Sequence, residues 1–232
     1  MILLGIWCQF FSFITTEYWA NRIDYTRFFM ATNASGGKMM EYRVVKTLKE
    51  EEDVFRLRYR VFCLEKKWLN PEEYPDGKET DKYDQHSVHF LAQNDTGKIV
   101  GTARAIFPSE LGLPVLNNFE DIATPDDVER YVELSRLIVA KETRGLTATI
   151  GLLKSILNWC LDEGITTAFV IVEERMLNFL LRLGYPFRKA GPGKFYFGAY
   201  TIPAYVTLSE LSKTLELMDI KKQKLFVEIF IL

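Results

Sequence analysis

Apolar residues along the chain recur at helical spacing in some stretches and at strand spacing in others. Thr47 and Glu50 form the pattern of a helix-capping box, and the apolar residues that follow are three or four positions apart as far as Leu64. This pattern predicts a helix that starts after Thr47. Further helices are expected from 146 to Gly164, from 173 to Gly184, and from Thr207 to about Met218.

Shorter stretches that are rich in β-branched and aromatic residues predict strands. The segments 87–93 and 98–107 flank an Asn-Asp-Thr-Gly turn and should form a hairpin. Other strands are expected at 132–140, at 166–172, at 194–200 and in a short segment after it. The stretch 108–130 contains three prolines and is expected to be an irregular connection.

The predicted elements follow one another as helix, hairpin, strand, helix, strand, helix and strand. This order combines a β-meander with βαβ crossovers, so it predicts an α/β or α+β domain with three layers around one mixed sheet. We expect this domain to span 39–220, with a tail at 221–232 and an N-terminal extension at 1–38.

The predicted extension begins with 16 residues that carry no charged side chain. A membrane-spanning helix needs about 20 apolar residues, and a secretory signal needs a basic start and a cleavage site that this segment lacks. Three interpretations stay open: an interfacial membrane anchor, an amphipathic flap on the domain, and a start codon placed too far upstream. We favour the last, in which the extension is non-native or disordered.

Composition and motifs exclude several classes of protein. The 232 residues are 48% hydrophobic with a net charge of −2, which suits a globular domain and gives no sign of nucleic-acid binding. Three widely spaced cysteines favour the reducing cytoplasm over a disulfide framework or a zinc site. There is no phosphate-binding glycine loop, and the only two histidines are poorly spaced for a metal, so we expect neither a metal nor a bound cofactor.

Four groups of polar residues interrupt otherwise apolar elements. They are Arg58 and Arg60 in the first helix, the acidic run Glu79, Asp81 and Asp84, the strand residue Arg104, and the group Glu133, Ser135 and Arg136. A charge in a buried strand is costly unless it is paired, so Arg104 and Glu133 need partners, and the acidic run is the natural source. Structural ion pairs explain any one of these residues equally well, but the whole set favours a functional site.

These groups also carry a family resemblance over residues 45–206. The segments LRYRVFCLEKKW, ETDKYD, GTAR and VELSRLIV resemble the autoinducer-synthase branch of the GNAT-like acyltransferases. Within that branch, VFCLEKKWLNPEEYPDG, YDQHSVHFLA and GYPFRKAGPGKFYFGAYTIPAYV are most similar to long-chain N-acyl amino acid synthases and to acyltransferases associated with the PEP-CTERM/exosortase system. The resemblance implies a GNAT-like three-layer fold with a mostly antiparallel mixed sheet between helices.

The resemblance also implies an activity, the transfer of a long-chain fatty acyl group from acyl carrier protein to the amine of an amino acid. The donor group would be carried on the 4′-phosphopantetheine of the carrier, because the loop RGLTATIG lacks the closely spaced glycines of a coenzyme A site. Two alternatives stay open: an acyl-homoserine-lactone synthase that uses S-adenosylmethionine, and a non-catalytic acyl-binding module.

The candidate site residues fall into four groups by expected role. The catalytic candidates are Glu133 as the base, Ser135, Asp84 and Asp81. The substrate-binding candidates are Arg58, Phe62, Trp68, Arg104 and Arg136. The candidates for the acyl chain and pantetheine are Val139, Arg144, Gly145 and Thr147. Arg58 or Arg104 would clamp the carboxylate of the acceptor, or both would only brace the acidic loop.

A docking surface is expected on independent grounds. Between Arg175 and Ser209 there are basic residues and no acidic ones, although the whole chain has a slight negative charge. Acyl carrier proteins are acidic, so this stretch is a plausible docking surface, and a merely solvated helix edge is the alternative. The residues concerned are Arg175, Arg182, Arg188, Lys189 and Lys194.

Overall fold

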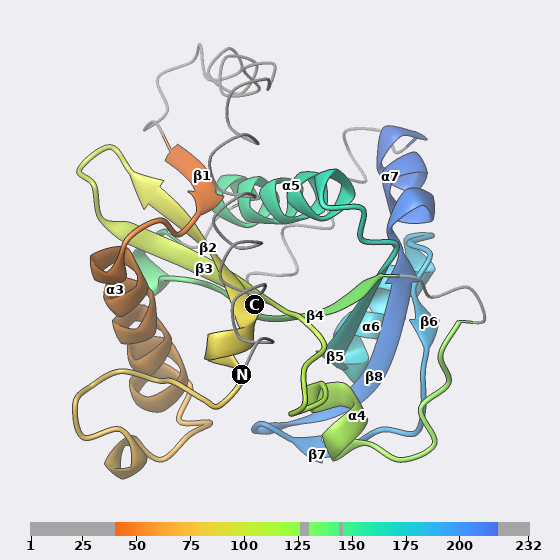
Figure 1. Cartoon of the computed structure of the whole chain (residues 1–232), viewed down its shortest axis with the longest axis horizontal. Coiled ribbons are helices and arrows are strands. Elements are labelled where there is room, and N and C mark those ends of the chain that lie inside the picture. Colours follow the sequence, from red (N-terminus) through yellow and green to blue (C-terminus); the bar gives the residue numbers. More distant parts are fainter. Residues whose placement is uncertain (1–39, 126–129, 144–145, 218–232) are drawn as a thin grey trace, which may run out of the picture. The chain divides into compact units, whose positions relative to one another are not determined.

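The computed structural model describes residues 40–125, 130–143 and 146–217 (Figure 1). The predicted extension at 1–38 and the tail at 221–232 lie outside the described residues. Arg144, Gly145 and the side chain of Thr147 also lie outside them.

The strands of the described residues form one mixed sheet, as predicted. Their order is β1-β2-β3-β4-β5-β8-β6, and β7 pairs with one end of β8. The bounds are β1 Met40–Val44, β2 Ser87–Asn94, β3 Ile99–Ile106, β4 Tyr131–Val139, β5 Thr167–Glu173, β6 Arg188–Lys189, β7 Lys194–Tyr196 and β8 Ala199–Thr207. Every pair is antiparallel except β4 with β5.

The first helix begins at the predicted capping box. In α3, Leu48–Tyr59, the Thr47 hydroxyl accepts a hydrogen bond from the Glu50 amide, and the Glu50 carboxylate accepts one from the Thr47 amide. The chain then continues as a π-helical turn, Arg60–Glu65. The helix predicted as far as Leu64 is therefore present in two parts, and the second part brings Phe62 into the core.

The other helices are α4 Pro114–Asn118, α5 Leu146–Asp162, α6 Glu174–Arg182 and α7 Leu208–Leu217. α5 packs on β1 to β4, while α6 and α7 cover β8 on the same face. α3 packs on β3 and α4 on β5, on the opposite face. The predicted three layers are therefore confirmed, and α4 adds a short helix to the stretch that was expected to be irregular.

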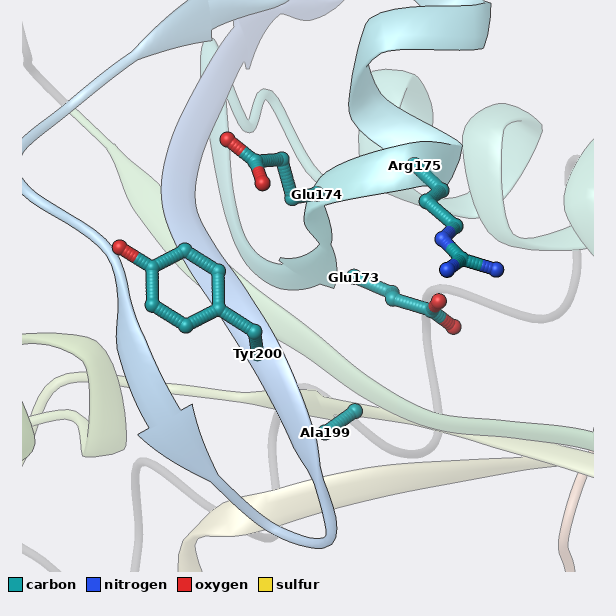
Figure 2. A pocket seen from close by; sticks show the side chains of 5 residues that line it. All are labelled: Glu173, Glu174, Arg175, Ala199 and Tyr200. Atoms are coloured by element: carbon teal, nitrogen blue, oxygen red, sulfur yellow. The ribbon is translucent and has the colours of Figure 1, made fainter.

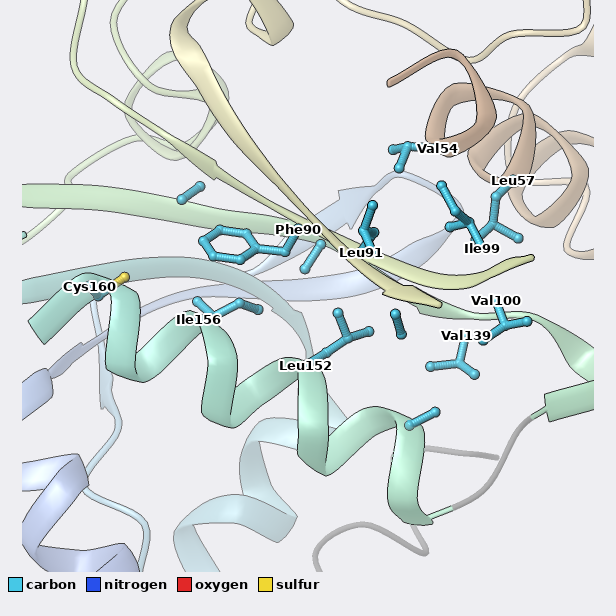
Figure 3. Packing of buried hydrophobic residues seen from close by; sticks show 14 of the residues in the cluster. Val54, Leu57, Phe90, Leu91, Ile99, Val100, Val139, Leu152, Ile156 and Cys160 are labelled. Atoms are coloured by element: carbon cyan, nitrogen blue, oxygen red, sulfur yellow. The ribbon is translucent and has the colours of Figure 1, made fainter. Parts of the chain in front are cut away.

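The main hydrophobic cluster packs α5 on one face of the first strands and includes Val54 and Leu57 of α3 on the other (Figure 3). Leu152, Ile156 and Cys160 project from one side of α5, which confirms the helical spacing seen in the sequence. Gly101 in β3 permits the close approach of this helix, because a Cβ at that position would lie 2.9 Å from Leu152 Cδ1. The same packing fixes β3 and β4, which carry several candidate site residues on their other face.

The expectation of a single strand at 194–200 is wrong. This segment is a hairpin in which β7 and β8 are joined by Phe197 and Gly198, with φ angles of 51° and 81°. Positive φ at two successive positions produces a tight turn that reverses the chain, and no polar residue marks this turn within the segment KFYFGAY. β8 is also a long strand inside the sheet, and β1 and β6 were not predicted.

Among the described residues, the helices fall short of the combination of length and hydropathy that a membrane-spanning segment requires.

Candidate active site

Three arginines and three carboxylates meet on the face of the sheet that carries α3. Arg58 comes from α3, Arg104 from β3 and Arg136 from β4. The carboxylates belong to Glu79, Asp81 and Asp84, in the loop between α3 and β2. Arg58, Glu79 and Arg104 are buried, so folding has removed their charges from water.

Each guanidinium group in this cluster binds two carboxylates. Arg58 donates to Glu79, and to both oxygens of Asp84 at 2.8 and 3.2 Å. Arg104 donates to both oxygens of Asp81 at 2.7 and 3.0 Å, and to Asp84 at 2.5 Å. Arg136 donates to Glu79 at 2.8 Å and to Asp81 at 3.0 Å. We call this closed set of ion pairs the arginine–carboxylate network.

The network keeps Glu79 and Asp84 ionised. Burial by itself would raise the pKa of Glu79, but Arg136 and Arg58 hold it below its ordinary value. For Asp84, Arg58 and Arg104 likewise outweigh burial and hold the pKa well below its usual range. These contacts confirm that the acidic run pairs with Arg104, and they favour bracing of the loop over a substrate clamp for Arg58 and Arg104. They also leave Asp81 and Asp84 holding arginines rather than moving protons.

A β-bulge places Arg136 in the network. The β3–β4 register shifts between Thr102, which pairs with Ile138, and Arg104, which pairs with Ser135. Arg136 lies in this irregularity with φ 55°, a left-handed conformation that is uncommon for a residue other than glycine. Strict alternation would send Ser135 and Arg136 to opposite faces, whereas here Ser135 binds Arg104 and Arg136 binds the same acidic loop.

Beside the network lies an aromatic cluster formed by Phe62, Trp68 and Phe197. The rings of Phe62 and Trp68 stack with centroids 6.0 Å apart, and the Phe197 ring meets them edge-on at 5.3 and 6.2 Å. The guanidinium carbon of Arg136 lies 4.5 Å from the Phe197 centroid and 5.5 Å from that of Phe62. Trp68 is 38% exposed, so one side of the cluster opens to solvent.

Glu133 is buried on the same face of the sheet but has its own partner. One carboxylate oxygen accepts a hydrogen bond from the Val115 amide at 2.7 Å, in the first turn of α4. The acidic loop was expected to supply the partner of Glu133. That expectation is wrong, because a carboxyl group pairs with a hydrogen-bond donor rather than with another carboxylate. Burial raises the pKa of Glu133 to about 7, partly offset by this hydrogen bond and by Arg104.

The sheet opens next to Glu133. β4 and β5 pair only over Tyr131–Leu134 and Thr167–Val170, although β4 continues to Val139 and β5 to Glu173. Beyond Leu134 the two strands therefore diverge, and the described ladder pairs none of the residues 135–138 with β5. Glu133 lies at the closed end of this divergence. The side chain of Val139 packs in the core under α5, which does not support its predicted contact with an acyl chain.

A surface hollow of about 420 Å³ lies at the far end of β5 (Figure 2). It is lined by Glu173, Glu174, Arg175, Ala199 and Tyr200. It contains none of the predicted catalytic residues and only one predicted docking residue, so it is separate from the site around Glu133.

The predicted docking residues do not form one surface. Arg175 and Arg182 are exposed on α6, seven positions apart, so they lie on one side of the helix. Arg188 forms an ion pair with Glu210 at 3.0 Å. Lys194 lies over the Phe119 ring, next to α4 on the other face of the sheet. Lys189 is exposed beside Arg188 on β6. Only Arg175 and Arg182 lie together on one helix, with Glu173 and Glu174 next to Arg175.

Sequence reasoning missed two contributors to the site. Phe197 completes the aromatic cluster, and the available signal was Gly198 within an aromatic-rich segment, which is compatible with a turn. Val115 supplies the hydrogen bond to Glu133, and nothing in its sequence context indicates this, because it acts through its backbone amide.

The network predicts that two arginines of α3, Arg58 and Arg56, contribute very differently to the free energy of unfolding. Arg58→Met should lower the free energy of unfolding by about 3–5 kcal/mol, because it leaves Glu79 and Asp84 buried with fewer partners. Arg56→Met, on the exposed side of the same helix, should change it by less than about 0.5 kcal/mol. Urea unfolding followed by circular dichroism measures both, and equal effects would contradict the buried network.

Comparison with known proteins identifies the family. Residues 41–210 match the family model described as autoinducer synthase. The isovaleryl-homoserine lactone synthase of Bradyrhizobium diazoefficiens is 27% identical over 161 residues, which cover 68% of this chain and 72% of that protein. An acyl-homoserine-lactone synthase of Yersinia enterocolitica is 26% identical over 164 residues, which cover 66% and 71%.

Solved structures agree with this assignment. A coenzyme A-dependent acyl-homoserine lactone synthase with bound S-adenosylmethionine and isopentyl-CoA is 27% identical, with a TM-score of 0.61 over 78% of this chain and 89% of the other. The fold is also that of an N-acyl amino acid synthase from uncultured soil microbes, which is 14% identical with a TM-score of 0.59 over 79% and 100%. The chain therefore belongs to the autoinducer synthase family and is an acyltransferase with a GNAT-like fold.

Proposed function

We propose that the enzyme transfers a fatty acyl group from a thioester on acyl carrier protein to the α-amine of an amino acid, giving an N-acyl amino acid. The observation that carries this proposal is the position of Glu133, a buried carboxyl with a pKa of about 7 at the closed end of the β4–β5 divergence. A thioester inserted between β4 and β5, where the two strands diverge beyond Leu134, would bring its carbonyl carbon towards this residue.

The proposed reaction needs a base of moderate strength. A neutral amine attacks the carbonyl carbon, a C–N bond forms, the C–S bond breaks, and the thiol of the carrier leaves. The pKa of a free α-amine is about 7.7–8.0, so a carboxylate with a pKa of about 7 is well matched to accept its proton. Glu133 is 1% exposed, so we propose that a water molecule relays the proton. Ser135, two residues along the same strand face, would orient that water.

Arg136 is the arginine best placed to hold the carboxylate of the acceptor. Its Nε and Nη2 atoms bind Glu79 and Asp81, but no hydrogen bond joins its Nη1 atom to any of the described residues. It is also 13% exposed, whereas Arg58 and Arg104 are buried. A charge-assisted hydrogen bond from Nη1 would place the α-amine near the β4 edge.

An acyl-homoserine-lactone synthase is the second candidate function. The relatives that are 26–27% identical carry that description, and one of the solved structures contains S-adenosylmethionine and an acyl-CoA. S-adenosylmethionine and amino acids share the α-amino acid group that Arg136 and Glu133 would recognise. The two functions therefore differ in the rest of the acceptor and in the donor, and product analysis separates them.

The first test identifies the acceptor and the donor. Purified enzyme is incubated with a long-chain acyl carrier protein or the matching acyl-CoA, together with either a mixture of amino acids or S-adenosylmethionine. We expect the mass of an N-acyl amino acid, formed fastest with the carrier protein. An acyl-homoserine lactone as the main product would establish the second function instead, and absence of turnover with every combination would leave an acyl-binding module.

The second test concerns Glu133. Glu133→Gln should reduce kcat by at least about 100-fold while the protein stays folded. The side-chain oxygen of glutamine can still accept the hydrogen bond from the Val115 amide, but it cannot act as a base. In the wild type, kcat/KM should rise with pH through an apparent pKa near 7, as the carboxyl ionises. A variant that retains activity and the same pH profile would exclude this base.

The same ionisation predicts a stability effect with a defined sign. The folded-state pKa of Glu133 is raised above the unfolded value of about 4.3, so its ionisation weakens the fold as pH rises from about 4.3 to 7. The melting temperature of Glu133→Gln, relative to the wild type, should therefore increase over this range and then level off. This readout checks the buried carboxyl independently of activity.

The third test concerns carrier docking. Arg175→Glu with Arg182→Glu should raise KM for acyl carrier protein at low salt, and the effect should shrink as salt screens the charges. The control variant Lys213→Glu changes an exposed lysine on α7 and should leave this KM unchanged. Equal KM values for the α6 variant and the wild type would remove this surface from the proposal.

A further inference from the structure

We propose that Tyr83 and Asn117 are positioning residues for Glu133: the hydrogen bond between their side chains holds α4 so that the Val115 amide stays on the Glu133 carboxyl group. This inference rests on the role of Glu133 in the proposed function and extends it to residues that act only through another group. It applies to both candidate acceptors, because both need the same base.

Glu133 faces apolar surroundings and a single donor. Its neighbours across the sheet, Ile106 on β3 and Phe169 on β5, are buried and point to the same face. Leu113 and Val115 belong to the same apolar cluster. The Val115 amide is the one hydrogen-bond donor to Glu133 among the described residues. Burial raises the pKa of Glu133 to about 7, and this hydrogen bond is the strongest influence that lowers it.

α4 cannot place that amide by itself. It has five residues, far fewer than an isolated helix needs, and no side chain caps its first turn. The buried side chains of Leu113 and Val115 fix how deep the helix lies, but apolar contact has no preferred direction. A hydrogen bond weakens steeply with angle, so the amide must also be held in direction. A directional contact elsewhere on α4 is therefore required.

Asn117 provides this directional contact. Its Nδ2 atom donates to the Tyr83 hydroxyl at 2.9 Å and to the Leu111 carbonyl oxygen at 2.6 Å. Because a carbonyl oxygen can only accept, the Leu111 contact fixes which end of the side-chain amide is the nitrogen. Asn117 follows Val115 by two residues in the same short helix, so its hydrogen bonds set the rotation of the turn. The Tyr83 contact is the one that ties α4 to a distant part of the chain.

Tyr83 is itself held by the acidic loop. Its amide donates to Asp81 at 2.9 Å, and its carbonyl oxygen accepts from the Ser87 hydroxyl at 2.6 Å. Asp81 belongs to the arginine–carboxylate network. A continuous series of contacts therefore runs from the network through Tyr83 and Asn117 to the donor of Glu133.

The other groups that act on Glu133 do not depend on α4. Arg104 on β3 and Arg136 on β4 favour its ionised form, and Asp81 in the acidic loop opposes it. Tyr196 on β7 also faces it. α4 carries no titratable side chain. A change in Glu133 that follows a disturbance of α4 alone therefore reports its amide donor.

The central variant of the experiment is Tyr83→Phe, which removes the hydroxyl group and keeps the ring and the backbone contacts of the acidic loop. Asn117→Ala removes the same hydrogen bond from the other side. The matched control is Tyr131→Phe. Tyr131 packs on Phe169 in the same apolar cluster, and its hydroxyl makes no hydrogen bond to any described residue.

The measurement is kcat/KM from about pH 5.5 to 9, with the donor and acceptor that the first test identifies. The variants are compared with the wild type at each pH, which cancels the ionisation of the acceptor amine. Melting temperatures establish that each variant is folded.

We expect Tyr83→Phe and Asn117→Ala to raise the apparent pKa of kcat/KM by at least about 0.5, because the carboxylate loses a donor that favours its ionised form. Relative to the wild type, kcat/KM should be about threefold lower near pH 6 and about equal near pH 9. The double variant should shift no further than Asn117→Ala, because both changes remove one interaction. Tyr131→Phe should keep the wild-type profile.

A second measurement does not depend on activity. The difference in melting temperature between Glu133→Gln and its parent is followed against pH, in the wild type and in the Tyr83→Phe background. A higher folded-state pKa delays ionisation and enlarges its total cost to stability. The difference should therefore level off at a higher pH, and at a larger value, in the Tyr83→Phe background.

Three outcomes overturn the inference while leaving the proposed function intact. They are a wild-type pH profile in both variants, an equal loss of kcat/KM at every pH, which indicates a merely structural role, and a melting series that levels off at the same pH in both backgrounds. Activity that survives Glu133→Gln overturns the role of Glu133 in the proposed function instead. The melting series then still decides whether Tyr83 positions the donor of the Glu133 carboxyl group.

Discussion

The buried arginine–carboxylate network is the interaction on which the rest of the site depends. Arg58, Arg104 and Arg136 come from a helix and two strands, and each is tied to the same acidic loop. The network is electrically balanced, with three positive and three negative groups, so it is tolerated out of water only when complete. It holds α3 against the sheet and fixes the loop, and it thereby sets the positions of Arg136 and the aromatic cluster.

Much of the fold could be predicted from the sequence because local rules and tertiary packing agree. The capping box at Thr47 and the apolar stripe of α5 specify helices by themselves, and the first hairpin has a recognisable turn. The β7–β8 hairpin was missed because Phe197 occupies a position that turn rules assign to small or polar residues. β1 was missed because its five residues mix apolar and charged side chains at the edge of the sheet.

The site was only partly predictable, for a related reason. The cost of burying charge indicated that Arg104 needed acidic partners, and the acidic loop supplies them. The partner of Glu133 is a backbone amide, which no residue type signals. The placement of Arg136 depends on the bulge in β4, because regular alternation would have pointed it to the other face. The pairing of charged side chains could therefore be predicted from the sequence, whereas contacts that depend on irregular backbone could not.

The single parallel strand pair divides the sheet into two halves, each continuous along the chain. β1 to β4 form one antiparallel half and β5 to β8 the other, and only a four-residue seam joins them directly. The pairings of β2 with β3 and of β7 with β8 are hairpins joined by short turns, which keeps their loop-closure costs low during folding. A molecule lying along the seam would touch both halves at once and replace the strand contacts that are missing there. Occupancy would then add to the contacts of α4, α5 and the aromatic cluster, which join the two halves beside the short ladder.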